Sequence, residues 1–329
     1  MAISIRDVAQ RASVSVGTVS NVLNRPTSVS SATVERVRRA IDELGYVRND
    51  AARQLRAGSS STVGLVVLDS GNPFFADIAR GAERAAAERD LSVLLGNSDE
   101  RHDREDAYLA LFEEQRVRGV LLSPASEDLA TARRLDDHGI PVVLVDRTAP
   151  GFASVSVDDV RGGDIAASHL LERGSRRLAF VGGPTGLRQV DDRFAGARRA
   201  TDRTEGASLE RLETAQLTVL AGREVGAEIA ARDAGDRPDA IFAANDLVAV
   251  GIMQALVMLG SVSIPDDIAL IGYDDIAFAQ STVVPLTSIR QPAQLIGSTA
   301  LELLDAQDDD EPAEVQFDPE LVVRASTGG

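Results

Sequence analysis

The 329-residue sequence contains no cysteine, no lysine and no tryptophan, and aromatic residues make up only 4% of it. The absence of cysteine excludes disulfide bonds, thiolate metal sites and a cysteine nucleophile. The absence of lysine excludes the phosphate-binding motif G-x-x-x-x-G-K-[ST]. The only histidines are scattered, at His102, His138 and His169, so neither a metal site nor a cofactor is expected.

Long apolar runs are also missing. No stretch approaches the roughly 20 residues that a membrane-spanning helix requires. The first residues, MAISIRDVAQ, lack the basic and apolar regions of a secretion signal. We therefore expect a soluble, cytoplasmic protein that does not act at a membrane.

Acidic residues outnumber basic ones, and the formal net charge is −17. Residues 1–58 nevertheless contain nine arginines against five acidic residues, a net charge of +4. The remainder contains 25 arginines against 46 acidic residues, a net charge of −21. A basic segment at one end of an acidic chain points to nucleic-acid binding by that segment.

Three short helices are predicted in residues 1–47. In each segment apolar residues recur at the spacing of one helix face. A tight turn at Ser13 and Val14 separates the first helix from the second, and Gly45 is placed to end the third. The serines that can cap the three helix starts are Ser4, Ser15 and Ser30. This arrangement predicts a helix-turn-helix DNA-binding domain.

Residues 48–61 are predicted to connect this domain to the rest of the chain. Asn49 can cap a short helix that runs to Arg56. Gly58 and the three serines after it then indicate a flexible linker.

From residue 62 onward, short apolar strands alternate with amphipathic helices. This alternation predicts an α/β fold with doubly wound parallel sheets, and it contains too many units for one sheet. We therefore expect two similar lobes, residues 62–158 with 290–318 and residues 159–289 with 319–329. The predicted strand segments are TVGLVVLD, LSVLLGNSD, GVLLSPA, IPVVLVDR, RRLAFVGG, LTV at 217–219, AIFAAND, IALIGYDD, the start of TSIRQPAQLIG, and the tail EVQFDPELVVRAST.

Planar polar side chains and an aromatic pair follow most of these strands. Ligands of open α/β sheets bind beyond the carboxyl ends of the strands, so we expect a binding site here. Taken singly, each polar residue could equally be a turn residue or a helix cap. The candidate residues are Asn72, Phe74, Phe75, Ser123, Asp146, Arg147, Arg193, Asn245, Asp274 and Gln291.

This set of residues suits the binding of a polyol better than the binding of a nucleotide or the catalysis of a reaction. No G-x-G-x-x-G follows a first strand, no G-x-S-x-G elbow occurs, and no histidine lies at a strand end. Asp, Asn, Gln and Arg side chains can satisfy sugar hydroxyls as both donors and acceptors. The faces of Phe74 and Phe75 can cover the apolar side of a sugar ring.

Over essentially its whole length, the chain resembles the LacI/GalR family of bacterial transcriptional regulators. The helix-turn-helix motif reads IRDVAQRASVSVGTVSNVLN, and the core motifs include GLVVLDSGNPFF, DDRFAGAR, AANDLVAVG, IGYDD and TSIRQP. The resemblance implies a helix-turn-helix domain followed by a two-lobed core similar to periplasmic binding proteins. It also implies a repressor that binds a palindromic operator as a homodimer, or as a dimer of dimers, under the control of a small sugar.

The resemblance further implies roles for residues of the DNA-binding part. The second helix would lie in the major groove, and Leu55 would insert into the minor groove and bend the DNA. Two residues differ from the usual pattern. Ser13 replaces a glycine with positive φ, and Asn21 replaces an arginine, which favours adenine over guanine. The residues expected to contact DNA are Ser4, Ser15, Val16, Gly17, Thr18, Ser20, Asn21, Asn24, Arg25, Asn49, Arg53 and Leu55.

In the core, the resemblance implies that nine of the ten candidate residues, all except Ser123, fall at positions where pentose-binding members of the family hold their sugar. D-ribose or another pentose is therefore the expected effector, with a polyol or a hexose as alternatives. Ser123 stands where those proteins often have asparagine. No aromatic residue occupies the segment 217–222, where an aromatic wall is expected.

Two other interpretations stay open at this point. A sugar-binding protein of a transport system would share the core but would not need the basic residues 1–58. An α/β enzyme acting on a phosphosugar or nucleoside would need a catalytic histidine, lysine or metal cluster at the strand ends, and the sequence offers none. We therefore expect a regulator and not an enzyme.

Overall fold

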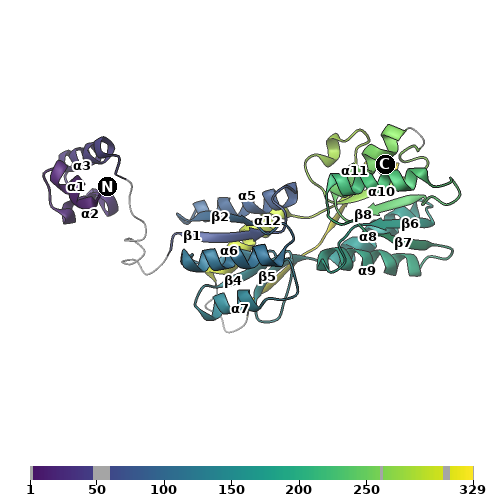
Figure 1. The fold of residues 1–329 in the computed structure, drawn as a ribbon, viewed down its shortest axis with the longest axis horizontal. Helices are drawn as coiled ribbons and strands as arrows, with labels where there is room; N and C mark the ends of the chain where they lie inside the picture. The colour runs from purple at the N-terminus through teal and green to yellow at the C-terminus, as the bar shows by residue number, and fades with distance from the viewer. Residues whose placement is uncertain (1–2, 47–59, 260–261, 307–311, 329) are drawn as a thin grey trace. The chain divides into compact units, whose positions relative to one another are not determined.

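The computed structural model describes residues 3–46, 60–259, 262–306 and 312–328 (Figure 1). The chain forms two units, Met1–Ser60 and Ser61–Gly329. The short helix predicted to run from Asn49 to Arg56 lies outside the described residues, as do the predicted DNA contacts Asn49, Arg53 and Leu55.

The first unit contains the three predicted helices. The Ser4 hydroxyl and N–H both donate to the Asp7 carboxylate over 2.7 Å. The Ser15 hydroxyl oxygen accepts a hydrogen bond from the Thr18 N–H at 3.0 Å. Gly45 ends the last helix with a left-handed φ of 61°. The elements are α1 (Ile5–Arg11), α2 (Val16–Asn24), the short 3₁₀ helix η1 (Pro26–Ser28) and α3 (Ser31–Leu44). Their buried core includes Val8, Val19, Val22 and Val37.

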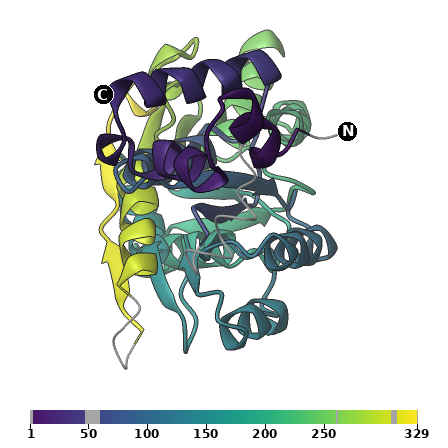
Figure 2. The same ribbon diagram turned by 90° about the vertical axis from the view of Figure 1, so that its left-hand side faces the viewer.

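The first lobe of the second unit is built on a six-stranded parallel sheet. From edge to edge its strands are β11 (Glu314–Phe317), β5 (Ala153–Val157), β4 (Val142–Val145), β3 (Val120–Leu122), β1 (Thr62–Val67) and β2 (Ser92–Asn97). Its helices are α5 (Pro73–Ala87), α6 (His102–Glu114), α7 (Ala130–Asp137) and α12 (Ala293–Asp305). Figure 2 shows the yellow C-terminal segment along one side of this lobe, where α12 packs on α5 and β11 pairs with β5.

Side chains of β1, which lies next to the edge strand β2, alternate between the two faces of this sheet. Leu65 and Val67 pack with Ile78 of α5 in one core cluster, whereas Val66 packs with Phe112 of α6 in another. Helices on both faces therefore bury the strand on both sides, which explains its continuous apolar sequence.

The second lobe repeats this design around another six-stranded sheet. All strand pairs are parallel except β10 with β12, which is antiparallel. From edge to edge the strands are β12 (Glu320–Val322), β10 (Thr287–Arg290), β9 (Ala269–Asp274), β8 (Ala240–Ala243), β6 (Arg177–Val181) and β7 (Ser208–Leu212). The helices are α8 (Asp159–Glu172), α9 (Arg188–Asp202), α10 (Val219–Ala231) and α11 (Asp246–Leu259), with the 3₁₀ helices η2 (Ala279–Ser281) and η3 (Ala325–Thr327).

The chain passes between the lobes three times, after β5, after β10, and between β11 and β12. Each lobe is therefore assembled from segments that are distant in the sequence. The prediction of an α/β core with two doubly wound sheets is confirmed.

One predicted strand, LTV at 217–219, is wrong. Thr218 instead caps α10, because its hydroxyl oxygen accepts a hydrogen bond from the Ala221 N–H at 3.3 Å. The strand of this region is β7, which the sequence pattern did not reveal. It lies at the edge of its sheet and its side chains are exposed or only half-buried, so it lacks the apolar run that marks the central strands.

Candidate functional site

The exposed face of α2 carries the side chains predicted to contact DNA. Val16 is 40% exposed, and Gly17 and Asn21 are exposed on the same helix. Thr18 and Ser20 are half-buried. Small, uncharged groups on an exposed helix can approach base edges closely in a major groove. The other predicted contacts in this unit, Ser4, Ser15, Asn24 and Arg25, are also exposed.

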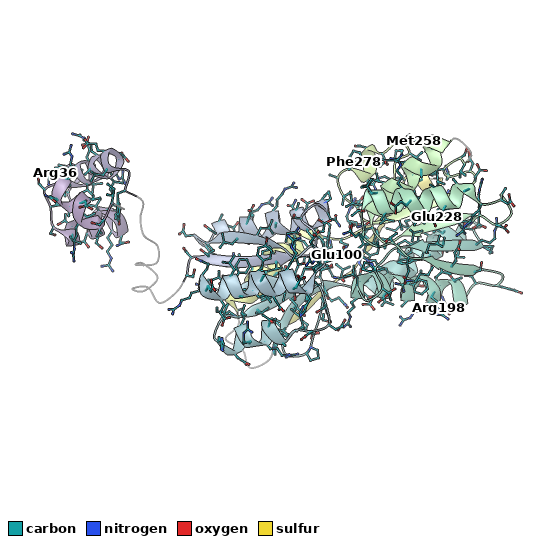
Figure 3. The ribbon with its side chains drawn as sticks, in the orientation of Figure 1. Arg36, Glu100, Arg198, Glu228, Met258 and Phe278 are labelled. Atoms are coloured by element: carbon teal, nitrogen blue, oxygen red, sulfur yellow. The ribbon has the colours of Figure 1, made fainter. Side chains whose placement is uncertain are left out.

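Arginines elsewhere in the same unit supply the positive charge that this helix lacks. Two arginines are paired within the unit, Arg11 with Glu43 and Arg39 with Glu35. The remaining guanidinium groups are available to DNA phosphates, which supply much of the affinity of such proteins. The arginines that make no ion pair within residues 3–46 are Arg6, Arg25, Arg36 (labelled in Figure 3) and Arg38.

The turn between α1 and α2 adopts the conformation expected of a glycine. Ser13 has a φ of 50°, in the left-handed region that costs a residue other than glycine about 1 kcal/mol. The turn geometry is thus the one the resemblance implies, and a serine adopts it.

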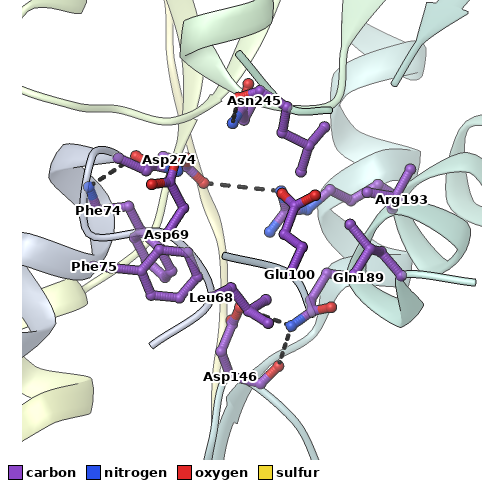
Figure 4. A pocket seen from close by; sticks show the side chains of 14 residues that line it. Leu68, Asp69, Phe74, Phe75, Glu100, Asp146, Gln189, Arg193, Asn245 and Asp274 are labelled. Carbon is purple, nitrogen blue, oxygen red and sulfur yellow. Dashed lines mark hydrogen bonds and ion pairs between the residues drawn. The ribbon is translucent and has the colours of Figure 1, made fainter. Parts of the chain in front are cut away.

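A cavity lies between the two lobes of the second unit, beyond the carboxyl ends of strands from both sheets (Figure 4). The empty space there, part of which is open to solvent, is about 460 Å³. Seven of the ten predicted effector-binding residues line it: Asn72, Phe74, Phe75, Asp146, Arg193, Asn245 and Asp274. The other lining residues, which were not among the predicted candidates, are Leu68, Asp69, Glu100, Leu187, Gln189, Val190 and Leu217.

Arg193 of α9 provides a fixed positive charge in the cavity wall. Its Nε donates to the Asp159 carboxylate and its Nη1 to the Ala244 carbonyl oxygen, both over 2.8 Å. Its guanidinium carbon lies 3.8 Å from the centre of the Tyr273 ring, and its Nη1 lies 3.8 Å from the Asp274 carboxylate. Burial alone would lower the pKa of Arg193, but the nearby carboxylates raise it above its ordinary value, so the group stays charged.

Two direct links connect the lobes across the cavity. The Asn72 Nδ2 of the first lobe donates to the Asp274 carboxylate of the second over 3.3 Å. The Gln189 Nε2 of the second lobe donates to the Asp146 carboxylate of the first over 3.1 Å, and to its carbonyl oxygen over 3.2 Å. Figure 4 shows the link between Gln189 and Asp146 as dashed lines.

Asp146 and Asp274 are carboxyl groups that a ligand can stabilise. Burial raises the pKa of Asp146 to about 8, and the Asp159 carboxylate adds to the effect. Burial also raises the pKa of Asp274 to about 6, against the opposing influence of Arg193. The Oδ1 of Asp146 has no hydrogen-bond partner. Because hydrogen bonds from a ligand favour the ionised form of a carboxyl group, both aspartates are suited to accept from hydroxyl groups.

Both aspartates also have unusual backbone conformations. Asp146 has a φ of 61° and Asp274 a φ of 101°. Strain of this kind costs about 1–3 kcal/mol per residue and is found where a ligand-binding geometry requires it.

The apolar part of the cavity is formed by both lobes. Phe74 and Phe75, at the start of α5, pack edge to face with their ring centres 5.1 Å apart. Leu217 stands in the segment without an aromatic residue, and it lines the cavity together with Leu187. An aliphatic side chain therefore occupies the place expected for an aromatic wall.

Three predicted effector-binding residues do not line this cavity. Ser123 is fully buried at the end of β3, and its hydroxyl has no hydrogen-bond partner. Arg147 turns away, donating to the Ser126 carbonyl oxygen and the Glu127 carboxylate. Gln291 lines a neighbouring hollow, and its Nε2 donates to Asp274 over 2.8 Å, so it contacts the cavity through that residue.

Three polar lining residues were missed, although their positions carry a signal. Asp69 and Glu100 follow β1 and β2, which the sequence predicts as strands, so the strand-end rule points to both residues. Gln189 lies in the first turn of α9, four residues before Arg193, and this spacing places both on one face of the helix.

Within the described residues, no group of three or more histidine, aspartate or glutamate side chains is arranged to hold a metal ion. None of the described helices is both long and apolar enough to cross a membrane.

Comparisons with known proteins identify the family. Residues 4–49 match the model of the bacterial regulatory proteins of the lacI family, and residues 167–327 match that of the periplasmic binding protein-like domain. The sequence is 34% identical over 335 residues to the ribose operon repressor of Halalkalibacterium halodurans, covering 99% of this chain and 97% of that protein. The chain belongs to the LacI family of bacterial regulatory proteins.

Two solved structures of LacI-family proteins support the assignment. A LacI-family regulator from Enterococcus faecium with bound ribose is 29% identical, with a TM-score of 0.74 over 81% of this chain and 98% of that one. The Lac repressor dimer bound to operator is 26% identical, with a TM-score of 0.84 over 99% of each chain. As a LacI-family member, the chain is a DNA-binding transcriptional regulator and not an enzyme.

Proposed function

We propose that this protein represses transcription from a palindromic operator and that a small sugar, bound between its lobes, controls its affinity for that operator. The observation that carries the proposal is the cavity between the lobes. There, carboxylate, amide and guanidinium groups line the same space as Phe74 and Phe75. Such groups can satisfy hydroxyls that both donate and accept, while the aromatic pair covers the apolar side of a ring.

D-ribose, or another pentose, is the effector we propose. Nine of the ten candidate residues, all except Ser123, match the pentose-binding pattern in sequence, and seven of these nine line the cavity. The solved Enterococcus faecium relative, with bound ribose, supports the same choice. A sugar that closes the lobes would shift their relative position, and this shift would reach the operator through the segment that joins the two units.

The proposed active form is a homodimer that matches two operator half-sites. Large apolar side chains are exposed on both lobes, which suits a surface that a second copy covers. Figure 3 labels Met258 and Phe278 on the second lobe. The exposed fractions are 44% for Leu94, 51% for Leu95, 72% for Met258, 56% for Phe278 and 81% for Val283. Because bacterial operator DNA lies in the cytoplasm, we infer that the protein acts there.

The test combines an operator gel shift with a ligand screen. The full-length protein is titrated onto DNA from upstream of its own gene, with and without D-ribose. A thermal-shift panel of pentoses, hexoses, polyols and nucleobases runs in parallel. We expect a specific shift that D-ribose or another pentose changes. Stabilisation by sugars without any specific DNA shift would favour a transport protein instead, and stabilisation by nucleobases alone would overturn the proposed effector.

A further inference from the structure

Glu100 lies in the turn after β2, and this turn is tied to the end of β1. The Glu100 N–H donates to the Leu68 carbonyl oxygen over 3.1 Å. The fully buried Ser98 donates its hydroxyl to the Val67 carbonyl oxygen over 3.1 Å. The turn therefore holds Glu100 beside Leu68 and Asp69, on the first-lobe side of the cavity.

The backbone of this turn is one that glutamate rarely adopts. Asp99 and Glu100 both have a φ of 57°, in the left-handed region. A glycine would take this conformation without strain. The side chain of Glu100 therefore does not favour the turn, and what it adds is a carboxyl group at the cavity.

That carboxyl group lines the cavity without a partner among the described residues. Figure 4 shows its side chain extending into the space that Arg193 and Asn245 also border. The nearest basic groups of the turn are engaged elsewhere, because Arg101 pairs with Asp103 and Arg104 with Asp99. Burial, followed by the carboxylates of Asp69 and Asp99, raises the pKa of Glu100 to about 7.

We propose that Glu100 is a further effector-contacting residue, which accepts a hydrogen bond from a sugar hydroxyl and, with Asp69, excludes sugars that carry a phosphate group. This inference rests on the proposed function, because it names a contact and a ligand class for the same cavity.

The charges around the cavity favour a neutral ligand. Four carboxyl groups line it, those of Asp69, Glu100, Asp146 and Asp274. The one guanidinium among the lining residues, that of Arg193, already pairs with Asp159. A phosphate placed here would leave water and meet more negative than positive charge, which is unfavourable. A neutral hydroxyl group can instead donate hydrogen bonds to these carboxyl groups, and it carries no charge for them to repel.

The proposed contact also couples binding to protons. A hydroxyl that donates to Glu100 favours its ionised form, so binding near pH 7 releases protons and affinity rises with pH. Asp146 and Asp274, with pKa values of about 8 and about 6, face the same cavity and contribute in the same direction. The part due to Glu100 is therefore the difference between the wild type and a Glu100 variant.

The experiment is isothermal titration calorimetry on the full-length protein with D-ribose and with D-ribose 5-phosphate. Two buffers of different ionisation heat, at about pH 7, report the protons released. We expect Glu100→Gln to weaken D-ribose binding about five- to tenfold, since it replaces a charge-assisted hydrogen bond by a neutral one. It should also release fewer protons and bind D-ribose 5-phosphate more tightly than the wild type does. Glu114→Gln removes an exposed carboxylate of the same lobe and should match the wild type.

A second variant separates contact from stability. Glu100→Gly should relieve the turn and raise the melting temperature of the free protein, yet weaken D-ribose binding at least as much as Glu100→Gln. If Glu100 had a structural role alone, the substitution would change the melting temperature and the affinity for D-ribose in the same direction.

The outcomes distinguish the two proposals. If the wild type binds D-ribose and both Glu100 variants keep its affinity and proton release, the role of Glu100 is overturned and the proposed function stands. If the wild type binds D-ribose 5-phosphate as tightly as D-ribose, the exclusion of phosphate is overturned. If the wild type binds no pentose, the proposed effector and the contact both fall.

Discussion

The side-chain amide of Asn72 in the first lobe donates a hydrogen bond to the carboxylate of Asp274 in the second. Gln189 makes the converse link, from the second lobe to Asp146 of the first. Polar groups that face the cavity thus satisfy one another across it, and a sugar must replace these bonds with its own hydroxyls. Because the replaced bonds join the lobes, sugar binding and lobe position are expected to depend on each other.

Asp274→Asn should abolish most of the sugar response and leave sugar-free operator binding unchanged. The substitution removes the charge that strengthens a hydrogen bond from the sugar, which is worth about 1.5–3 kcal/mol. The D-ribose concentration that alters the operator gel shift should therefore rise by about ten- to a hundredfold. The matched control is Asp202→Asn, which removes an exposed carboxylate of α9 in the same lobe. An unchanged D-ribose titration for Asp274→Asn would count against the site.

Arg193→Ala is expected to lose the sugar response as well, but for two reasons at once. Its removal would also leave the buried Asp159 without its partner, which destabilises a protein by about 3–5 kcal/mol. The loss of response is therefore interpretable only with a parallel measurement of unfolding, and Asp274→Asn gives the sharper test.

The sugar-free protein should become less stable as pH rises from about 5 to about 8. Burial raises the pKa of Asp274 to about 6 and of Asp146 to about 8, above the value of about 3.9 in an unfolded chain. The folded state therefore binds more protons in this range, and the stability that these groups contribute is lost as pH rises through their folded pKa values. Urea denaturation at several pH values should show a smaller fall for Asp146→Asn than for the wild type. Equal falls in both proteins would contradict the assignment, and Asp202→Asn again serves as the control.

Local signals in the sequence were sufficient for the helix-turn-helix unit. Ser4 and Ser15 cap helices as predicted, and Gly45 ends α3 with a left-handed φ. Such caps depend on residues within one turn of each other, so no tertiary information is needed. Central strands were found for a related reason, because burial on both faces imposes a continuous apolar run.

The residues that line the cavity could be predicted only in part, because a side chain at a strand end can bind a neighbouring side chain instead of facing the cavity. The strand-end rule identified Asp146 and Asp274, whose backbone fixes their position. It did not reveal that Arg147, with a long side chain, binds Glu127 on its own lobe. Glu100 was missed although the strand before it was predicted, because it lies three residues beyond the end of β2 and reaches the cavity through a turn with a left-handed backbone.

Ser13→Gly should stabilise the helix-turn-helix unit. Ser13 has a φ of 50°, and glycine adopts this conformation without the cost of about 1 kcal/mol that serine bears. Amide hydrogen exchange of residues 3–46 in the full-length protein should slow accordingly. Ala32→Gly, on the exposed side of α3, should have the opposite effect, since glycine costs about 1 kcal/mol in a helix. Faster exchange in Ser13→Gly would show that the turn does not store this strain.

Asn21→Ala should weaken binding to the operator and leave non-specific binding nearly unchanged. Asn21 is exposed on α2, and an asparagine that pairs with adenine contributes about 1–3 kcal/mol of discrimination. Arg38→Ala provides the contrast, because the loss of a phosphate contact weakens binding to all sequences and reduces its salt dependence. Both are measured by gel shift at fixed salt on operator and on unrelated DNA. A loss of the same size on both DNAs for Asn21→Ala would contradict base reading by this residue.

Leu95→Glu should shift the protein from dimer to monomer. Leu94 and Leu95 are adjacent on the edge strand β2, so their side chains point to opposite faces of the sheet. Both are nevertheless exposed, Leu94 by 44% and Leu95 by 51%. Two exposed leucines on an unpaired edge favour association, and a charge placed there opposes it. Analytical ultracentrifugation should show the change, and operator affinity should fall because one monomer contacts a single half-site. Leu111→Glu introduces the same charge at a leucine that is 43% exposed on α6 of the same lobe. If Leu95→Glu stays dimeric, or if Leu111→Glu dissociates equally, the second copy does not contact β2.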